Sequence, residues 1–237
     1  MRIIAFGDSF TYGHGLKDCL KDSYMPGDKP SKFTYVSLLA EKLGCELFNF
    51  SLPGNSNHAI WYQATLGESL RQHEYHKDDI VIVSWSFTNR FAFSNDVDSI
   101  SAITKFGRYK LYFDKVEKQF TYKTDFTRQE QQKQHKMFKN LYREYHSDIQ
   151  GQLQLAQQMT HLQSFLENKV KTVIHSSVDK LSYLTTSLIP NIDVPFVWHT
   201  DVQDRSKALD GNHPGEAAHQ EVAEIYNSIL QERKIII

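Results

Sequence analysis

The sequence contains little of several residue types, and each shortage excludes a class of protein. Only two of its 237 residues are cysteines, Cys19 and Cys45, so the chain cannot form a disulfide framework. Glycine (11) and proline (6) are scarce while aromatic residues make up 13%, which excludes a disordered or low-complexity chain. No apolar stretch reaches the roughly 18 residues that a membrane-spanning helix needs, and the mean hydropathy is −0.50.

The sequence also lacks an excess of charge of either sign. It has 27 Lys and Arg against 28 Asp and Glu, a formal net charge of −1, so we expect no nucleic-acid partner. At the N-terminus, the apolar run Ile3–Phe6 is interrupted at once by Gly7 and Asp8. This run is too short for the core of a secretory signal, so we expect a cytoplasmic protein with free thiols.

Short apolar runs alternate with longer helical patterns, as in parallel βαβ units. The run Asp79–Trp85 is rich in β-branched residues and apolar on both faces, as expected of a central strand covered by helices on both sides. We therefore predict a three-layer α/β/α fold around a five-stranded parallel sheet. The expected strands are Arg2–Phe6, Glu46–Phe50, Asp79–Trp85, Lys171–His175 and Pro195–His199, and the expected helices are Phe33–Leu43 with Gly44 as its C-cap, Asn57–His73, Gln129–Lys169 and Glu216–Leu230.

About 85 residues separate the third and fourth expected strands, too many for one crossover. We predict a single domain over residues 1–237, with an insertion at about 94–128 in which Arg108–Lys123 forms a small hairpin. Residues 105–144 hold 11 Lys or Arg against 5 Asp or Glu and are rich in aromatics. They could form a solvated amphipathic helix whose rings face the core, or a surface that binds an anionic or sugar-like partner.

Two motifs carry candidate chemistry, one near each end of the chain. Gly7-Asp8-Ser9 follows the first strand, at the edge where open α/β sheets place their ligands. Asp210-Gly-Asn-His213 precedes the last helix, and its carboxylate can orient the imidazole so that the other ring nitrogen accepts a proton from a serine. Taken separately, the first could be only a turn and the second only a helix start.

Together, these motifs resemble those of the SGNH hydrolases, also called the GDSL family. A third motif, Leu52-Pro-Gly54-Asn55, looks like the family's glycine block after the second strand. The resemblance implies a flavodoxin-like fold and a serine esterase that needs no cofactor and no metal. In it Ser9 is the nucleophile, His213 the base and Asp210 its partner, while the N–H groups of Ser9 and Gly54 bind the oxyanion.

The fourth block departs from the family pattern of Gly-x-Asn-Asp. In Phe87-Thr88-Asn89-Arg90, Asn89 matches the oxyanion asparagine, Phe87 replaces the glycine and Arg90 replaces the aspartate. If Asn89 is not the third donor, Ser86 or Thr88 could supply a hydroxyl, or the hole could rely on backbone groups. Arg90 could bind an anionic group of the substrate or form a structural ion pair.

The expected substrate is a small-molecule or carbohydrate ester, in particular an O-acetylated sugar, because many members of the family remove acetyl groups from carbohydrates. The alternatives are a lipid ester or thioester, or a non-catalytic relative that binds a glycan or a protein. Possible substrate contacts are His14, Asn55, Trp85 and Arg90. A metal site at His175, His199 and Asp201 lacks the tight spacing of metal ligands, and we expect His219 at the surface or in a helix cap.

Overall fold

A computed structural model gives the structure of the chain. It describes residues 1–20, 26–65, 74–96, 99–104, 107–114, 119–123, 147–198 and 200–236. For residues 91–123 it describes the backbone but not the side chains.

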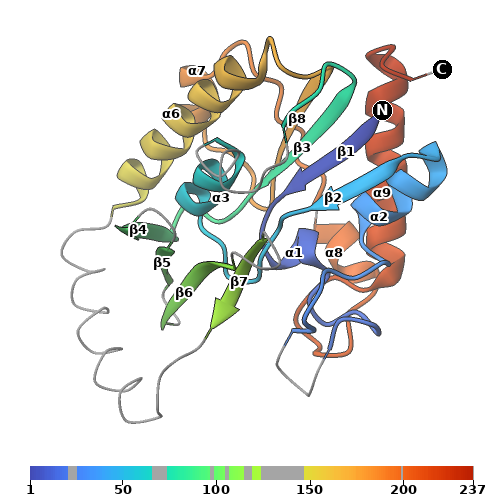
Figure 1. Cartoon of the computed structure of the whole chain (residues 1–237), viewed down its shortest axis with the longest axis horizontal. Helices are drawn as coiled ribbons and strands as arrows, with labels where there is room; N and C mark the ends of the chain where they lie inside the picture. Colours follow the sequence, from blue (N-terminus) through green and yellow to red (C-terminus); the bar gives the residue numbers. More distant parts are fainter. Residues whose placement is uncertain are drawn as a thin grey trace.

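The core of the fold is a parallel sheet with the strand order β2-β1-β3-β8. The strands are β1 (Arg2–Phe6), β2 (Glu46–Asn49), β3 (Asp79–Trp85) and β8 (Thr172–Ser177). All four were predicted from apolar runs, and β1 and β3 have the predicted bounds. Because the strands are parallel, the loops that follow β1, β2, β3 and β8 share one edge of the sheet (Figure 1).

The predicted fifth strand is not found among the described residues. Pro195–Trp198 has no strand pairing, and His199 lies outside the described residues. Val197 and Trp198 are nevertheless buried, with 1% and 0% exposure, and pack in the same core as Ile3 and Tyr35. Side-chain packing therefore holds this segment without backbone pairing, and the apolar pattern reported its burial correctly but not its conformation.

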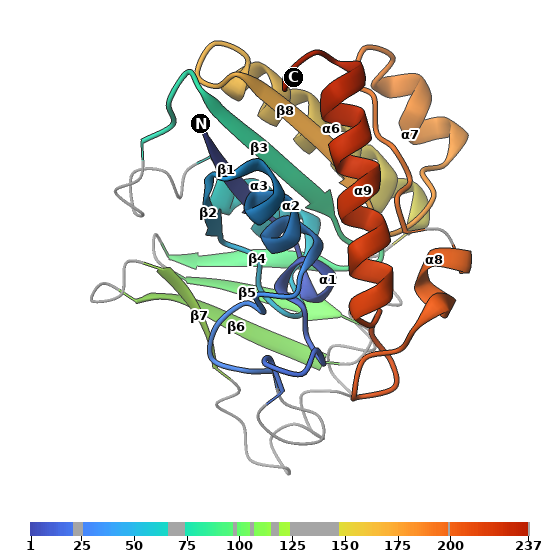
Figure 2. The same cartoon turned by 90° about the vertical axis from the view of Figure 1, so that its right-hand side faces the viewer.

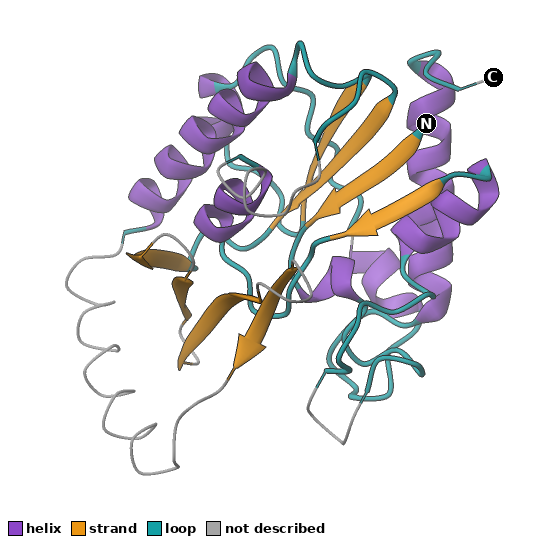
Figure 3. Cartoon of the chain, in the orientation of Figure 1, coloured by secondary structure: helices purple, strands orange, loops and turns teal. Residues whose placement is uncertain are grey.

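Helices cover both faces of the sheet, as predicted for a three-layer fold (Figure 3). The strands alternate between the two layers: Ile3, Ala5, Ile80 and Ile82 face one core, and Ile4, Phe6, Val81 and Val83 face the other. Helices α2 (Tyr35–Leu43) and α9 (Glu216–Glu232) cover the first face, and α3 (Asn57–Ala64) and α6 (Asp148–Leu166) cover the second.

The local sequence explains where these helices begin and end. Thr34 caps α2 by accepting a hydrogen bond from the N–H of Ser37, and Gly44 ends the helix with φ +60°, as predicted. Ser147 caps α6 through the N–H of Gln150. The predicted extensions of α3 over 66–73 and of α6 over 129–146 lie outside the described residues. Three short helices were not predicted: α1 (Ser9–Tyr12), α7 (Tyr183–Leu188) and α8 (Thr200–Arg205).

A second sheet follows β3, with the antiparallel order β4-β5-β6-β7. Its strands are β4 (Phe91–Asp96), β5 (Ser99–Thr104), β6 (Gly107–Asp114) and β7 (Gln119–Lys123). The pairing of β6 with β7 confirms the predicted hairpin, which is part of a larger sheet that begins before residue 94. Figures 1 and 2 show this sheet beyond the carboxyl ends of β1 and β3. None of the described helices has the length and apolar character needed to cross a membrane.

Candidate active site

Ser9 lies at the start of α1, in the tight turn that follows β1. Asp8 caps this helix, its Oδ1 accepting a hydrogen bond from the N–H of Phe10 at 3.0 Å. Position 7 has no room for a larger residue than glycine, since a Cβ there would collide with the Thr11 side chain. Ser9 is 5% exposed, and no described residue accepts a hydrogen bond from its N–H. The first N–H groups of a helix have no partner within it, so this one can bind an anion.

The loop after β2 packs directly on this turn. The Gly7 carbonyl accepts hydrogen bonds from the N–H of Leu52 at 3.2 Å and from the side-chain amide of Asn55 at 3.0 Å. Gly54 adopts φ +75°, a conformation that glycine reaches without steric cost. Among the described residues, none accepts a hydrogen bond from the N–H of Gly54. The two predicted backbone donors thus come from adjoining loops.

Asp210 and His213 form a hydrogen-bonded pair in the loop before α9. Asp210 Oδ2 lies 2.5 Å from His213 Nδ1, while Oδ1 accepts hydrogen bonds from the N–H groups of Asn212 at 3.0 Å and His213 at 3.1 Å. The Asp210 side chain is 4% exposed and that of His213 is 20% exposed. The carboxylate is thus fixed in place, whereas part of the imidazole is open to solvent.

The charge on Asp210 is maintained by these contacts. Burial alone would raise the pKa of this carboxyl, but the hydrogen bonds from Asn212 and His213 outweigh it, so the pKa lies below its ordinary value. An ionised Asp210 accepts the Nδ1 proton of His213. The lone pair of the imidazole is then on Nε2, the tautomer that a general base requires.

The loop after α1 contacts the Asp210 loop, so segments about 195 positions apart in the sequence lie side by side. Gly15 has φ +86°, and a Cβ there would lie 2.8 Å from the Asp210 carboxyl carbon. The N–H of Leu209 donates to the Gly15 carbonyl at 2.9 Å. The His14 ring is 4.5 Å from the His213 ring, measured between centroids. The absence of a side chain at Gly15 therefore allows the Asp210–His213 pair to approach the loop that follows α1, the helix that begins at Ser9.

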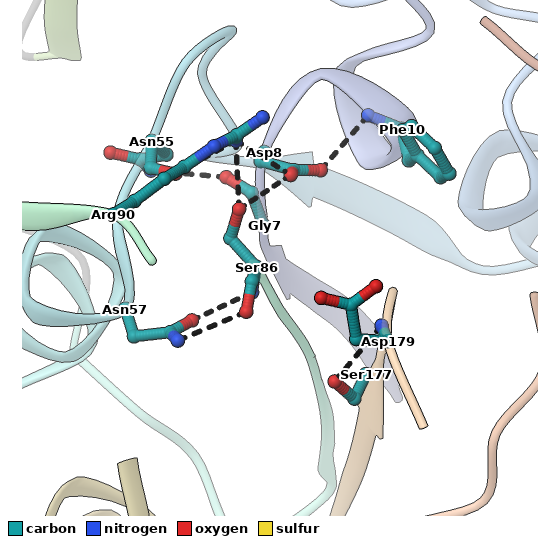
Figure 4. A network of polar contacts seen from close by, with 9 residues as sticks. All are labelled: Gly7, Asp8, Phe10, Asn55, Asn57, Ser86, Arg90, Ser177 and Asp179. Carbon is teal, nitrogen blue, oxygen red and sulfur yellow. Dashed lines mark hydrogen bonds and ion pairs between the residues drawn. The ribbon is translucent and has the colours of Figure 1, made fainter. Parts of the chain in front are cut away.

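Asn89, Ser86 and Arg90 follow β3, and their side chains differ in whether they are available to bind an oxyanion. Asn89 lies in the turn closed by the hydrogen bond from Arg90 N to Phe87 O at 3.2 Å, and no described residue bonds to its side chain. Ser86 is fully buried and its hydroxyl donates to Asp8 Oδ2 at 2.7 Å, so it is not available as the third oxyanion donor. Arg90 forms an ion pair with Asp8 at 3.0 Å (Figure 4).

Two predicted substrate contacts are inaccessible. Asn55 and Trp85 are both 0% exposed. The Asn55 side-chain amide donates to Gly7 O and to Gln63 Oε1, and the Trp85 indole N–H donates to His175 Nδ1 at 3.0 Å. Both side chains therefore serve the fold. Asn55 and Trp85 were predicted as contacts because they lie beside candidate motifs in the sequence, and that placement does not report whether a side chain is buried.

The prediction for His219 needs correction as well. His219 is 1% exposed, stacks on Tyr35 and accepts a hydrogen bond from its N–H at 3.2 Å, so it is neither a surface nor a capping residue. Its spacing to Val222, Ala223 and Tyr226 on one helix face was the sequence signal for burial. His175 is 1% exposed and lies between Trp85 and Gln163.

Within the described part of the chain, one cluster has residues of the kind that bind metals. The ligand atoms of His14, Asp210 and His213 all lie within 4.8 Å of one another. However, the 2.5 Å between Asp210 Oδ2 and His213 Nδ1 is a hydrogen-bond distance, shorter than the separation of two tetrahedral zinc ligands with bonds of about 2.0–2.1 Å. The arrangement favours proton transfer.

Comparison with known proteins places the chain in a family. The model of the GDSL-like lipase/acylhydrolase family matches residues 3–225. The chain belongs to this family. It is therefore a hydrolase of carboxylic esters. A search of curated protein sequences finds no match.

Two solved structures of carbohydrate esterases share the fold at low sequence identity. A carbohydrate esterase family 2 enzyme with a carbohydrate-binding domain from Corynascus thermopiles has 14% identity and a TM-score of 0.53, over 98% of this chain and 66% of that one. A carbohydrate esterase whose active site is described as having divergent catalytic and non-catalytic binding functions has 13% identity and a TM-score of 0.50, over 98% and 69%. A protein of the G-D-S-L family from Desulfitobacterium hafniense has 11% identity and a TM-score of 0.48, over 97% and 99%.

Proposed function

We propose that this GDSL hydrolase is a serine esterase with a Ser9–His213–Asp210 triad. His213 Nε2 removes the hydroxyl proton of Ser9 as Oγ attacks the ester carbonyl. The same proton passes to the leaving alcohol when the tetrahedral intermediate collapses to the acyl-enzyme. Water, deprotonated by His213, then attacks the acyl carbon, and the proton passes from His213 to Ser9 Oγ as the bond to Ser9 breaks and the acid leaves. The observation that carries the proposal is the partly buried Asp210–His213 pair, packed against the loop that follows the helix of Ser9.

The oxyanion would be bound by the N–H groups of Ser9 and Gly54 and by the side-chain amide of Asn89. All three follow strands that end at the same edge of the sheet. Fixed donors of this kind stabilise the charge that develops on the carbonyl oxygen, and loss of one costs about 10²–10³ in rate.

We propose small acyl esters as substrates, in particular O-acetyl groups on a carbohydrate. Two structures with TM-scores of 0.50 and 0.53 are carbohydrate esterases, which supports testing such substrates first. Lipid esters and thioesters remain the alternative within the enzyme class. We also infer that the chain is a single domain with an insertion at about 94–128. The family match extends on both sides of that region, and its strands pair only with each other.

The test is labelling with a fluorophosphonate followed by peptide mapping, together with hydrolysis of p-nitrophenyl acetate, a longer p-nitrophenyl ester and acetylated xylan. We expect the label on Ser9. Ser9→Ala should lower turnover by at least about 10³ without unfolding the protein, and Ser187→Ala, in the exposed helix α7, should leave it unchanged.

A label on another residue, or a loss below tenfold in Ser9→Ala, would remove Ser9 from the nucleophile role. Preference for the longer ester would favour a lipid substrate. An inactive, unlabelled protein that binds xylan would favour a non-catalytic glycan-binding relative.

A further inference from the structure

Arg90 occupies the position at which the family pattern has an aspartate, and its guanidinium joins three loops. Its NH1 atom lies 3.0 Å from Asp8 Oδ2, 2.8 Å from Ser86 Oγ and 3.2 Å from the Asn55 carbonyl (Figure 4). These acceptors follow β1, β3 and β2, respectively. The guanidinium carbon also lies over the ring of Phe87, 4.7 Å from its centroid, in a cation–π contact.

This network is buried and charged. The Asp8 side chain is 0% exposed and that of Arg90 is 14% exposed. Since the Ser86 hydroxyl donates to Asp8 at 2.7 Å, its oxygen accepts from Arg90. Each of Asp8, Ser86 and Arg90 thus bonds to the other two. A buried carboxylate without its cation strongly destabilises the folded protein. The positions of Asp8 and Ser86 therefore depend on the presence of Arg90.

The partners of Arg90 are the immediate neighbours of the proposed oxyanion donors. Asp8 precedes Ser9, and its other oxygen fixes the first turn of α1 through the N–H of Phe10. Asn55 follows Gly54 in the loop after β2. The guanidinium nitrogen thus adds a charged link between the two loops that present the N–H groups of Ser9 and Gly54, beside the hydrogen bonds that Leu52 and Asn55 donate to the Gly7 carbonyl.

We propose that Arg90 is a positioning residue for the oxyanion hole. It holds the Ser9 and Gly54 loops at the separation that the intermediate requires, and it neutralises Asp8, whose charge would otherwise oppose the negative charge developing next to Ser9. The inference rests on the proposed serine mechanism. It assigns Arg90 no direct contact with the substrate, in contrast to the anion-binding role considered from the sequence.

The field of this ion pair extends to the end of the neighbouring strand. Asp179 follows β8 and lies near the network in Figure 4. Its pKa is raised by burial and by the charge of Asp8, and Arg90 opposes this rise. Removal of the Arg90 charge would therefore leave two carboxylates, Asp8 and Asp179, without compensation at the edge where the oxyanion forms.

The chain offers a matched control for an Arg–Asp pair that is remote from the site. Arg2 binds Asp79 through two nitrogens at 2.8 and 2.6 Å, with side-chain exposures of 19% and 1%, at the opposite end of β1 and β3. Arg2→Met therefore breaks an ion pair of similar burial between the same two strands. It should lower stability and leave turnover within about twofold.

The experiment compares kcat and KM for p-nitrophenyl acetate in Arg90→Met, Arg90→Lys and Arg2→Met. A displacement of about 1 Å in a catalytic group can cost about 10² in rate, so we expect Arg90→Met to lower kcat by about 30- to 100-fold with KM changed less than threefold. Arg90→Lys keeps the charge and a donor on a shorter side chain, so it should recover kcat to within about tenfold of the parent. If Arg90→Met does not fold, the Asp8→Asn/Arg90→Met double variant removes the uncompensated carboxylate, and its kcat should still be at least tenfold below that of the parent.

Three results would overturn the inference: kcat within twofold of the parent in folded Arg90 variants, a rise in KM at unchanged kcat, or an equal loss of kcat in Arg2→Met. The second would identify Arg90 as a substrate contact and the third would indicate general loosening of the sheet. A parent chain that neither hydrolyses esters nor is labelled at Ser9 would reject the proposed function, and this inference with it. An active, Ser9-labelled parent with unaffected Arg90 variants would reject only the inference.

Discussion

The environment of His175 predicts that the protein loses stability in mild acid. This histidine is 1% exposed in the core behind the site, and its Nδ1 accepts the indole N–H of Trp85 at 3.0 Å. Nε2 must therefore carry the proton that it donates to Gln163 Oε1 at 3.1 Å. Burial lowers the pKa of His175 from 6.5 to about 3, so the ring remains neutral in the folded protein.

The size of the effect follows from this difference in pKa. Between pH 6.5 and about 3, the unfolded chain binds a proton at this histidine and the folded chain does not, so the free energy of unfolding falls as the pH falls. At about pH 5, one and a half units below the unfolded value, the loss is about 2 kcal/mol relative to neutral pH, at 1.36 kcal/mol per unit. His219, with a pKa also lowered to about 3 by burial, contributes in the same direction.

Urea unfolding at pH 7 and pH 5 measures this loss. His175→Gln can accept from Trp85 and donate to Gln163, and it does not titrate, so its loss of stability between the two pH values should be about 2 kcal/mol smaller than that of the parent. His161→Gln is the control, because His161 is exposed and accepts a hydrogen bond from the indole N–H of Trp61, as His175 does from Trp85. An equal pH dependence in the parent and His175→Gln would refute the reasoning, since it would mean that His175 titrates alike in both states.

Two further predictions concern the site. Asp210→Asn should lower kcat by about 10⁴ with the fold retained, because an amide in place of Oδ2 would donate to His213 Nδ1 and reverse its tautomer. Steady-state kinetics measures the loss of kcat, and circular dichroism checks that the fold is retained. A loss below tenfold would exclude Asp210 as the partner of the base. Gly54→Ala and Gly44→Ala place a side chain at φ +75° and +60°, so each should lower the free energy of unfolding in urea by about 1–2 kcal/mol. Only Gly54→Ala should also lower kcat, and equal kcat values in the two variants would remove Gly54 from the oxyanion hole.

The sequence predicted the elements whose pattern is local. The apolar runs Arg2–Phe6 and Asp79–Trp85 gave strands with the bounds that the structure has, and Gly44 ends its helix as expected. The Asp210–His213 pair was also predictable, because two residues three positions apart in a turn can meet without help from the rest of the fold.

Features that depend on distant contacts could not be predicted in this way. Trp198 is buried without joining the sheet, because its ring packs against Tyr35 and Phe10. The ion pair of Arg90 was one of two possibilities until the loop of Asp8 was seen to lie beside it. In both cases the partner lies more than 80 positions away, and no local pattern identifies it.

One side chain shows why the site depends on the core as much as on its motifs. Phe10 follows Ser9 directly, and its ring lies 5.1 Å from Trp198, 6.4 Å from Phe87 and 6.0 Å from His213, each in an edge-to-face arrangement. These rings come from three separate loops, and all three lie far from Phe10 in the sequence. Aromatic pairs of this kind are directional, so the packing of Phe10 fixes the helix that begins at Ser9 relative to the imidazole of His213. In the proposed mechanism the GDSL motifs would supply the reactive groups, and this aromatic contact would set their alignment.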